Sequence, residues 1–377
     1  MAIEYIEIRS ADTREIIGII DGAQSVIWHS VYYGCGDFEI YIAATAKNVE
    51  LLQVGNYASK PFSDELGIIE RVEITNTVTD GKMIVASGRL AKSILDRRHI
   101  YNISGHTNEP TILSGKVETA VRTVVQNNAI SCLFDSRRNI SILELGELGN
   151  YPEIIVDDDG NATQKQVSYQ NLLTYTDSVL EEYGLSSKII IDEDTSKLQF
   201  IVYKGENRSA DNTDGNDPVI FSIEFDNLIE DNYVFDLASW KNAALIGGEG
   251  EGLERFYSLI AGTETGLERR ETFIDASSIS KSHDQDQTYT DAVYNQMLIS
   301  DGLQKLAALI PLEDFQGQLN VTGGVWKLGE HYNLGDIVTV QDNELGFYIN
   351  VRITEITETQ DESGYGVDVT YSAERTD

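Results

Sequence analysis

The chain has 377 residues, 41% of them hydrophobic and only five of them proline, which excludes a disordered or linker-rich protein and predicts two to four packed domains. Its 62 acidic and 28 basic residues give a net charge of −34, which excludes a surface built to hold nucleic acid tightly. Neither a basic leader near Met1 nor a run approaching roughly 18 apolar residues is present. We therefore expect a protein made in a cytoplasm, without membrane insertion.

Residues 1–100 are predicted to form a first β-barrel domain of the tube type. Apolar and polar residues alternate with period two at 37–42, and β-branched and aromatic residues are frequent at 25–33. Asp80-Gly81 is typical of a hairpin turn between two further strands. Short strands at such regular spacing favour a barrel or a sandwich.

Residues 101–226 are predicted to form an inserted α+β domain. Apolar residues recur at helical spacing in 115–128 and in 170–183, and Gly184 stands where a helix commonly ends with glycine. A hairpin is expected to follow, with strands at 188–192 and 197–203.

The rest of the chain is predicted to form a second barrel, interrupted by a helix. Strands expected at 227–280 would be its first part, 281–314 a helical insertion, and 315–377 its second part. The long helix is expected between Thr290 and Ile310, ahead of Pro311. The predicted fold class is thus mainly β, with two related tube-like β-barrels, an inserted α+β domain and a long helix.

An internal repeat links the two predicted barrels. We call residues 54–90 the first repeat and residues 334–373 the second repeat. Each begins with an apolar residue, a glycine and Asn or Asp, and reaches Glu-Leu-Gly about a dozen residues later, before two further strands. Gly55 and Gly335 would supply the tight turn that starts each repeat. Duplication explains the matched spacing, although β-meanders can also resemble one another by chance.

Three loops contain residues suited to ligands. The run Gly247–Gly252 lacks the Lys-Ser/Thr of a phosphate-binding loop and contains two glutamates, so we expect a structural turn. Asp157–Asn161 does not have the spacing of a calcium loop, because Ile155 stands where an oxygen ligand is needed, and a hairpin turn is expected. Asp211–Asp217 is interpreted in the same way, with an adventitious calcium site as the alternative for both acidic loops.

No constellation of catalytic residues is recognised. The histidines form no close pair, no Gly-x-Ser-x-Gly motif is present, and no carboxylate pair stands out. Cys35 and Cys132 are expected to be buried, inert thiols. The basic cluster Asp96–His99 is expected to pair with acidic surface between domains or subunits, with a DNA contact as the alternative. The five histidines, none of which is placed as a catalytic pair, are His29, His99, His106, His283 and His331. We predict that the protein is not an enzyme and has no catalytic, cofactor-binding or metal-binding residues.

Several segments in their order along the chain give it a resemblance to a known family. These segments are Gly36–Ile40, Gly205–Arg208, Phe221–Leu228, Asn242–Gly252, Gly266–Glu271, Phe273–Ala276 and Asn333–Asp336. With them, the chain resembles the siphovirus Gp37-like group of phage tail proteins, which shares the central hub fold of T4-type tails.

The resemblance implies a trimeric ring at the tail tip of a virion, assembled in the host bacterial cytoplasm. Two tube-like barrels per subunit would offer six similar units to the tail tube protein or the distal tail protein. Such a hub would adapt six-fold to three-fold symmetry and line or close the DNA channel. Because the chain ends just after the second barrel, we expect a tip spike, fibre or receptor-binding protein to be a separate chain.

Other functions remain open at this stage. A carbohydrate-binding adhesin, a glycosidase or peptidase acting on the cell wall, and the hub of a contractile injection system or tailocin are the alternatives. The acidic composition either confers solubility or lines a conduit through which DNA passes without specific binding.

Overall fold

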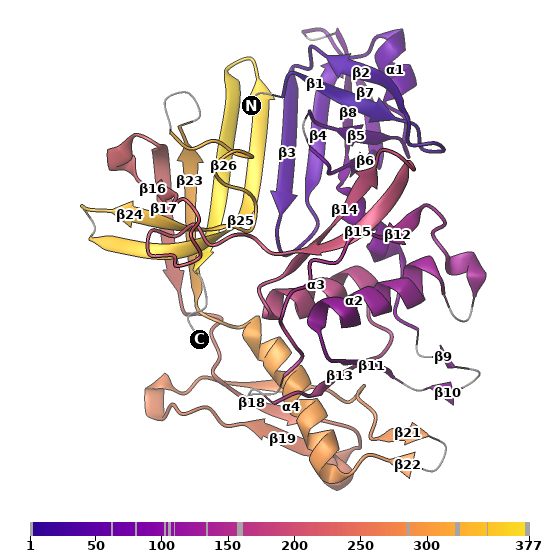
Figure 1. Cartoon of the computed structure of the whole chain (residues 1–377), viewed down its shortest axis with the longest axis vertical. Coiled ribbons are helices and arrows are strands. Elements are labelled where there is room, and N and C mark those ends of the chain that lie inside the picture. Colours follow the sequence, from indigo (N-terminus) through magenta and orange to yellow (C-terminus); the bar gives the residue numbers. More distant parts are fainter. Residues whose placement is uncertain are drawn as a thin grey trace. The chain divides into compact units, whose positions relative to one another are not determined.

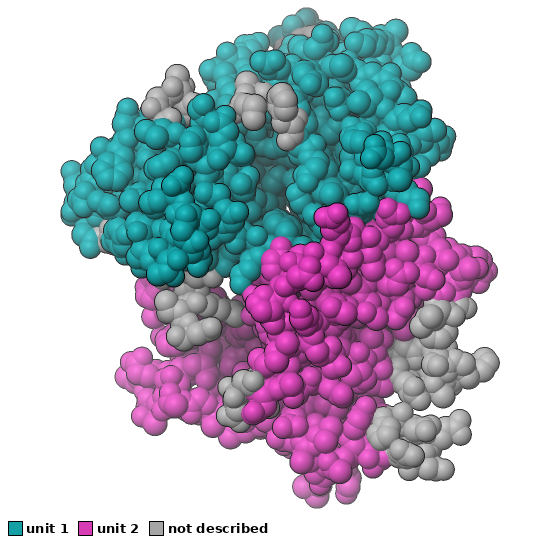
Figure 2. Space-filling view, viewed as in Figure 1, with its two compact units in different colours: residues 1–93, 186–234, 313–377 teal, residues 94–185, 235–312 magenta. Residues whose placement is uncertain are grey.

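The computed structural model describes residues 3–61, 63–79, 81–101, 103–104, 107–108, 110–132, 135–156, 161–284, 287–320, 325–344 and 346–373 (Figure 1). The chain divides into two compact units, coloured separately in Figure 2. Unit 1 contains residues 1–93, 186–234 and 313–377, and unit 2 contains residues 94–185 and 235–312. The chain therefore leaves unit 1 twice and returns to it twice.

The N-terminal part of unit 1 consists of short strands around one core. A four-stranded sheet has the order β2-β1-β5-β6, while β3, β4, β8 and β7 belong to a larger sheet. Both sheets bury side chains in the same cluster, which includes Ile8, Trp28 and Ile40. The bounds are β1 (Tyr5–Arg9), β2 (Ile16–Asp21), β3 (Ser25–Val31), β4 (Asp37–Ala43), α1 (Ala46–Leu51), β5 (Tyr57–Ser59), β6 (Gly67–Ile68), β7 (Arg71–Thr77), β8 (Gly81–Arg89) and the 3-10 helix Ala91–Arg97.

The C-terminal part of unit 1 continues the larger sheet around a second core. This core includes Phe221, Val338 and Tyr371, and its two long strands β25 and β26 form the hairpin drawn in yellow in Figure 1. A further hairpin, β14 with β15, also belongs to unit 1. The bounds are β14 (Ser186–Asp192), β15 (Lys197–Tyr203), β16 (Ile220–Phe221), the 3-10 helix Ile223–Phe225, β17 (Leu228–Asp236), β23 (Leu312–Leu319), β24 (Ile337–Asp342), β25 (Phe347–Asp361) and β26 (Gly364–Ala373).

Unit 2 contains the long helices. Asn171 caps α3 because its Oδ1 accepts hydrogen bonds from the backbone N–H groups of Leu173 and Thr174, and Gly184 follows the helix with a φ of +65°. The helix bounds are α2 (Val117–Val125), α3 (Leu172–Glu182) and α4 (Asp291–Ala307), with a π-helical turn at Gln126–Ile130 and 3-10 helices at Ser136–Arg138, Gly252–Glu254 and Gly266–Glu268. These helices confirm the three predicted from apolar spacing.

The strands of unit 2 are short. β18 pairs with β19 in antiparallel fashion and with β20 in parallel fashion, and α4 contributes Tyr294 and Leu298 to the core on one side of this sheet. The bounds are β9 (Ile103–Ser104), β10 (Thr107–Asn108), β11 (Thr111–Ser114), β12 (Leu143–Leu145), β13 (Gln164–Val167), β18 (Ala243–Gly247), β19 (Tyr257–Ile260), β20 (Glu271–Asp275), β21 (Ser282–Asp284) and β22 (Gln287–Thr288).

The fold is mainly β, as predicted, but its segments are grouped differently from the sequence-based domains. The prediction joined 227–280 with 315–377, whereas β18–β20 and α4 share a core of their own in unit 2. The hairpin of β14 and β15, assigned to the insertion, lies in unit 1. Within the described residues the strands form open sheets rather than two closed barrels. In the same part of the chain, no helix is long and apolar enough to span a bilayer.

Candidate functional site

Both repeats begin with the same backbone turn. Gly55 has a φ of +96° and Gly335 a φ of +91°, a conformation that residues with a Cβ rarely adopt. The Gly55 N–H donates to the Ile69 carbonyl at 2.8 Å, and the Gly335 N–H donates to the Ile353 carbonyl at 2.9 Å. Each of these isoleucines donates its own N–H back, to Asn56 or to Asp336, at 2.9 Å. The sequence repeat is therefore also a structural repeat.

The strands that follow the two turns keep the same register. Tyr57 lies opposite Ile68 in the first repeat, and Ile337 lies opposite Arg352 in the second. Both repeats end in an antiparallel hairpin, formed by β7 and β8 in the first repeat and by β25 and β26 in the second. The first repeat is interrupted between β6 and β7, whereas β25 runs through with a bulge between Ile353 and Glu355.

The large sheet contains the hairpins of both repeats, β7 with β8 and β25 with β26. Its strand order is β17-β23-β26-β25-β3-β4-β8-β7. We call β3-β4-β8-β7 the first half-sheet and β17-β23-β26-β25 the second half-sheet. They meet where β25 pairs with β3, from Glu355 opposite Val31 to Asp361 opposite Ser25. Among the described residues, β7 and β17 are the two edges at the ends of this order.

A buried tyrosine lies where the half-sheets meet. Tyr32 follows β3 and is fully buried, and its N–H donates to the carbonyl of Thr354 at the bulge. The Tyr32 hydroxyl accepts a hydrogen bond from the N–H of Gly205 at 3.3 Å, and the Arg352 guanidinium lies 5.5 Å from the ring centroid. A Cβ on Gly335 would lie 2.2 Å from the ring, so only glycine fits there. Tyr32 thus fixes the second repeat against the end of β3.

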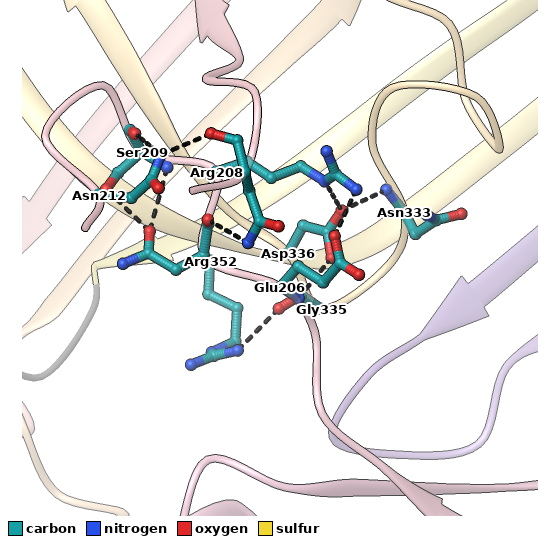
Figure 3. Close-up of polar contacts among 10 residues, drawn as sticks. Glu206, Arg208, Ser209, Asn212, Asn333, Gly335, Asp336 and Arg352 are labelled. Carbon is teal, nitrogen blue, oxygen red and sulfur yellow. Dashed lines mark hydrogen bonds and ion pairs between the residues drawn. The ribbon is translucent and has the colours of Figure 1, made fainter. Parts of the chain in front are cut away.

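Asp336 joins two segments that are distant in sequence (Figure 3). Its carboxylate accepts hydrogen bonds from the N–H groups of Glu206 and Asn333, both at 2.8 Å, and from Arg208 Nε at 3.2 Å. Asp336 is only 2% exposed, and this burial raises the pKa of its carboxyl, while the two backbone hydrogen bonds and Arg208 oppose the rise. Arg352 in turn donates to the Gly335 carbonyl at 2.7 Å. The network therefore has a positioning role.

A pocket of about 410 Å³ in unit 1 contains a buried ion pair. Lys60 pairs with Glu358 of β25, and Glu358 also accepts a hydrogen bond from the Tyr365 hydroxyl at 2.7 Å. Burial lowers the pKa of Lys60 from 10.5 to about 8, against the opposing charge of Glu65. Because Lys60 is held by a carboxylate, it connects the first repeat with β25 rather than presenting a free amine. Sequence reasoning missed this pair and Tyr32, because no local pattern marks residues that meet across the chain.

The glycine run at 247–252 forms the structural turn that was predicted. Arg255 donates hydrogen bonds to the carbonyls of Gly247 at 3.0 Å and Gly248 at 3.1 Å. The Tyr294 hydroxyl accepts a hydrogen bond from the Glu249 N–H at 2.8 Å. The turn is therefore filled by the protein's own side chains.

The acidic loops differ in what the structure describes. In Asp211–Asp217, Asn212 donates to the Ser209 and Asn216 carbonyls, and Asp211 accepts from Asn350 at 2.8 Å. These contacts form a polar turn. In Asp157–Asn161, the residues 157–160 lie outside the described part of the chain.

The other candidate side chains are dispersed. His29 lies 3.4 Å from Asp37 and 3.1 Å from Glu355, whereas His331 accepts a hydrogen bond from the Lys327 N–H. His106 and the side chain of His283 lie outside the described residues. In the cluster Asp96–His99, Arg98 donates to the Arg138 carbonyl at 2.8 Å and Asp96 accepts from Asn171, all within unit 2.

The two thiols are only partly buried, which corrects the sequence-based prediction. Cys35 and Cys132 are both partly exposed. Burial is still enough to raise the pKa of the Cys132 thiol, against the opposing charges of Arg138 and Arg98. Across the described ranges, no group of three His, Cys, Asp or Glu side chains is placed to hold a metal ion.

Comparison with known proteins identifies a family. The model of the family described as siphovirus ReqiPepy6 Gp37-like protein matches residues 5–371. A tail protein from Neisseria meningitidis MC58 is similar in structure, with a TM-score of 0.56 at 10% identity over 98% of this chain and 96% of that one. The 43 kDa tail protein of prophage MuSo2 from Shewanella oneidensis has a TM-score of 0.52 at 14% identity, covering 98% of each chain. No curated protein matches the sequence.

These structural likenesses concern the fold, since the identities are low. The family match covers nearly the whole chain, including the first repeat, all but the last two residues of the second repeat, and the Asp336 network. The chain therefore belongs to the siphovirus ReqiPepy6 Gp37-like family.

Proposed function

We propose that three copies of this chain form a ring that serves as the hub at the tip of the tail. The observation that carries the proposal is the tandem order of the large sheet, in which β25 of the second half-sheet pairs with β3 of the first. The strand equivalent to β25 in the first half-sheet is β7, and the strand equivalent to β3 in the second is β17. The same pairing can therefore be made between β7 of one copy and β17 of the next.

The side chains on these two edges support their coverage by a neighbouring strand. β17 exposes Ile229, Val234 and Phe235, and β7 exposes Ile74. An antiparallel β7–β17 contact would pair backbone groups along both edges and cover these apolar side chains.

The ring relates two symmetries. Each copy contributes two equivalent half-sheets, so three copies present six to the six-fold tail tube protein or distal tail protein while remaining three-fold at the tip. A tip spike, fibre or receptor-binding protein would then attach as a separate chain. The net charge of −34 suits a wall along which DNA passes without binding, because carboxylates repel phosphates. The role is geometric and non-catalytic.

Disulfide trapping tests the β7–β17 contact directly. In a background with Cys35→Ser and Cys132→Ser, cysteines are placed at Asn232 of β17 and, one at a time, at Glu73, Thr75 and Thr77 of β7. Strand pairing places opposed Cβ atoms about 4.5–5.5 Å apart, close enough for a disulfide. We expect one of the three pairs to give covalent trimers on oxidation.

A matched control places the partner cysteine at Val78, which is fully exposed just beyond β7, and is expected to give no covalent trimers. The mass of the unmodified protein provides an independent check. A species that stays monomeric across the concentration range, with no pair giving covalent trimers, contradicts the proposed ring.

A further inference from the structure

The sheet of β18, β19 and β20 in unit 2 has one covered face and one open face. Ile246 and Ile274 are buried on the side where α4 contributes to the core. On the opposite side, which we call the outer face, Leu245, Leu259 and Phe273 are exposed by 43%, 55% and 52%. Leu245 of β18 lies directly opposite Leu259 of β19 on one side and opposite Phe273 of β20 on the other. The three side chains therefore form one apolar row across all three strands.

An arginine and two aromatic rings extend this row. A Cβ on Gly247 would come within 2.7 Å of the Arg255 guanidinium, so the missing side chain leaves the space that Arg255 occupies. Its guanidinium lies 6.0 Å from the Tyr257 ring centroid and 5.4 Å from that of Phe273, and pairs with Asp275 at 2.6 Å. Arg255 is held by these contacts before any partner arrives.

A repeated turn stands at each end of the outer face. The sequence Gly-Leu-Glu-Arg occurs at 252–255, ahead of β19, and again at 266–269, ahead of β20. Since β19 and β20 run in opposite directions beside β18, the two turns lie at opposite ends of the sheet. Their leucines, Leu253 and Leu267, are almost completely exposed. A continuous row of large apolar side chains bounded by two such leucines is uncommon on a surface that faces only water.

We propose that the outer face is a docking surface for a different tail chain, whose contact surface is apolar and bordered by lysines and arginines. Phe, Tyr and Arg are enriched at protein interfaces, Tyr and Arg also among the residues that carry most of the binding energy, and the leucines add apolar area around them. The inference rests on the proposed function in one respect, namely that the partner is another component of the same tail.

The charge around the outer face distinguishes a second copy of this chain from a different, basic partner. The segment from Glu249 to Asp275, which contains β19, β20 and both turns, has seven carboxylates and three arginines and is therefore net negative. Arg255 and Arg269 are already paired, with Asp275 and Glu271. A second copy of this chain, itself at −34, would bring one acidic border against another. A partner with a basic border complements the face instead.

Photo-crosslinking in assembled tails identifies the occupant. Leu259→Cys, in the Cys35→Ser and Cys132→Ser background, is labelled with a benzophenone maleimide and incorporated into tails, which are then illuminated. We expect a crosslink to a different chain, at a peptide that contains Lys or Arg. A crosslink only to a second copy, only within the same chain, or to a peptide without basic residues overturns the proposal.

Binding measurements with the captured chain provide the second test. Phe273→Asp is expected to weaken its binding to the free protein by at least about tenfold, and added salt to weaken it further. Val78→Asp, also on an exposed apolar residue, is the matched control and leaves binding unchanged. Unaltered binding of Phe273→Asp overturns the proposal.

Two further controls keep the result interpretable. If Phe273→Asp fails to fold by circular dichroism, Leu253→Asp with Leu267→Asp replaces it, because nearly fully exposed leucines contribute little to folding. The mass of the free protein reports the trimer independently of the outer face. Loss of docking with an intact trimer therefore separates failure of this inference from failure of the proposed ring.

Discussion

The two repeats use one backbone design with different chemistry at matching positions. Gly55 corresponds to Gly335, Asn56 to Asp336, and Lys60 to Val340, counted from the shared turn. The first repeat has a neutral amide at its turn and a buried ion pair nearby. The second has a buried carboxylate at its turn and an apolar strand after it. The shared hydrogen bonds thus specify the turn, while the side chains specify what each turn is fixed to.

Substitution of the two turn glycines, Gly335 and Gly55, should give the largest difference in unfolding free energy between the repeats. Gly335→Ala places a Cβ 2.2 Å from the Tyr32 ring at a positive φ, whereas a Cβ on Gly55 would meet only Ala11, at 3.7 Å. We expect about 3–5 kcal/mol of destabilisation for Gly335→Ala and about 1–2 kcal/mol for Gly55→Ala. Urea unfolding measures both. Equal losses would mean that backbone strain alone, and not the contact with Tyr32, decides the cost.

The polar residues of the turns come next. Asp336→Ala leaves the N–H groups of Glu206 and Asn333 and the Nε of Arg208 without this acceptor, and should cost about 3 kcal/mol. Asn56→Ala removes a hydrogen bond to the Leu51 carbonyl and one from the Ala11 N–H, and should cost about 1–2 kcal/mol. Thermal unfolding at fixed pH compares them. A larger loss for Asn56→Ala would contradict the assignment of Asp336 as the principal connection.

Lys60 of the first repeat, which has no titratable counterpart at Val340 of the second, should make the free energy of unfolding depend on pH. The folded pKa of Lys60, about 8, lies below its unfolded value near 10.5, so the unfolded chain holds more protons between these values. Stability should therefore rise with pH in the lower part of this window, by about 1 kcal/mol from pH 7.5 to pH 9.

The matched variant is Lys60→Met, which places an apolar residue there as Val340 does in the second repeat. The rise with pH should be absent from its urea unfolding curves. A slope that is the same in both proteins would assign the titration to other groups. Burial raises the pKa values of Tyr203 and Tyr371, so these groups destabilise the fold as the unfolded chain loses their protons near pH 10, and the comparison is made up to pH 9.

The smallest expected effect on stability concerns the sheet edge. Ile74 of β7 corresponds in register to Glu358 of β25, yet Ile74 is 52% exposed and Glu358 only 5%. The difference arises because β3 lies beside β25, whereas β7 has no such neighbour in the described chain. Ile74→Lys should change the unfolding free energy of the isolated chain by under about 0.5 kcal/mol while abolishing the trimer. Light scattering that still shows trimers would refute the edge contact.

Local patterns predicted much of this molecule. Apolar spacing located α2, α3 and α4, and the matched Gly-Asn and Gly-Asp turns located the repeats. The segments Gly205–Arg208 and Asn333–Asp336 were noted separately in the sequence, and the structure joins them through Asp336.

What the sequence could not predict is which strands share a core. β18–β20 have the same short apolar pattern as the strands of unit 1, and only long-range packing on α4 separates them. The Lys60–Glu358 pair and the position of Tyr32 depend equally on partners hundreds of residues away. Periodicity describes which face of a strand is apolar, but not what covers it.

The bulge in β25 has a consequence for how the chain matures. One half of this strand pairs with β24 and the other with β3, so a strand made late joins both to the same large sheet. During synthesis, the edge of β3 that pairs with β25 stays uncovered from the time residue 31 is made until residue 361 has been made. Such distant pairing folds slowly and leaves the nascent sheet prone to aggregation. The ribosome-bound intermediate, rather than the finished protein, is therefore where a chaperone would be most needed.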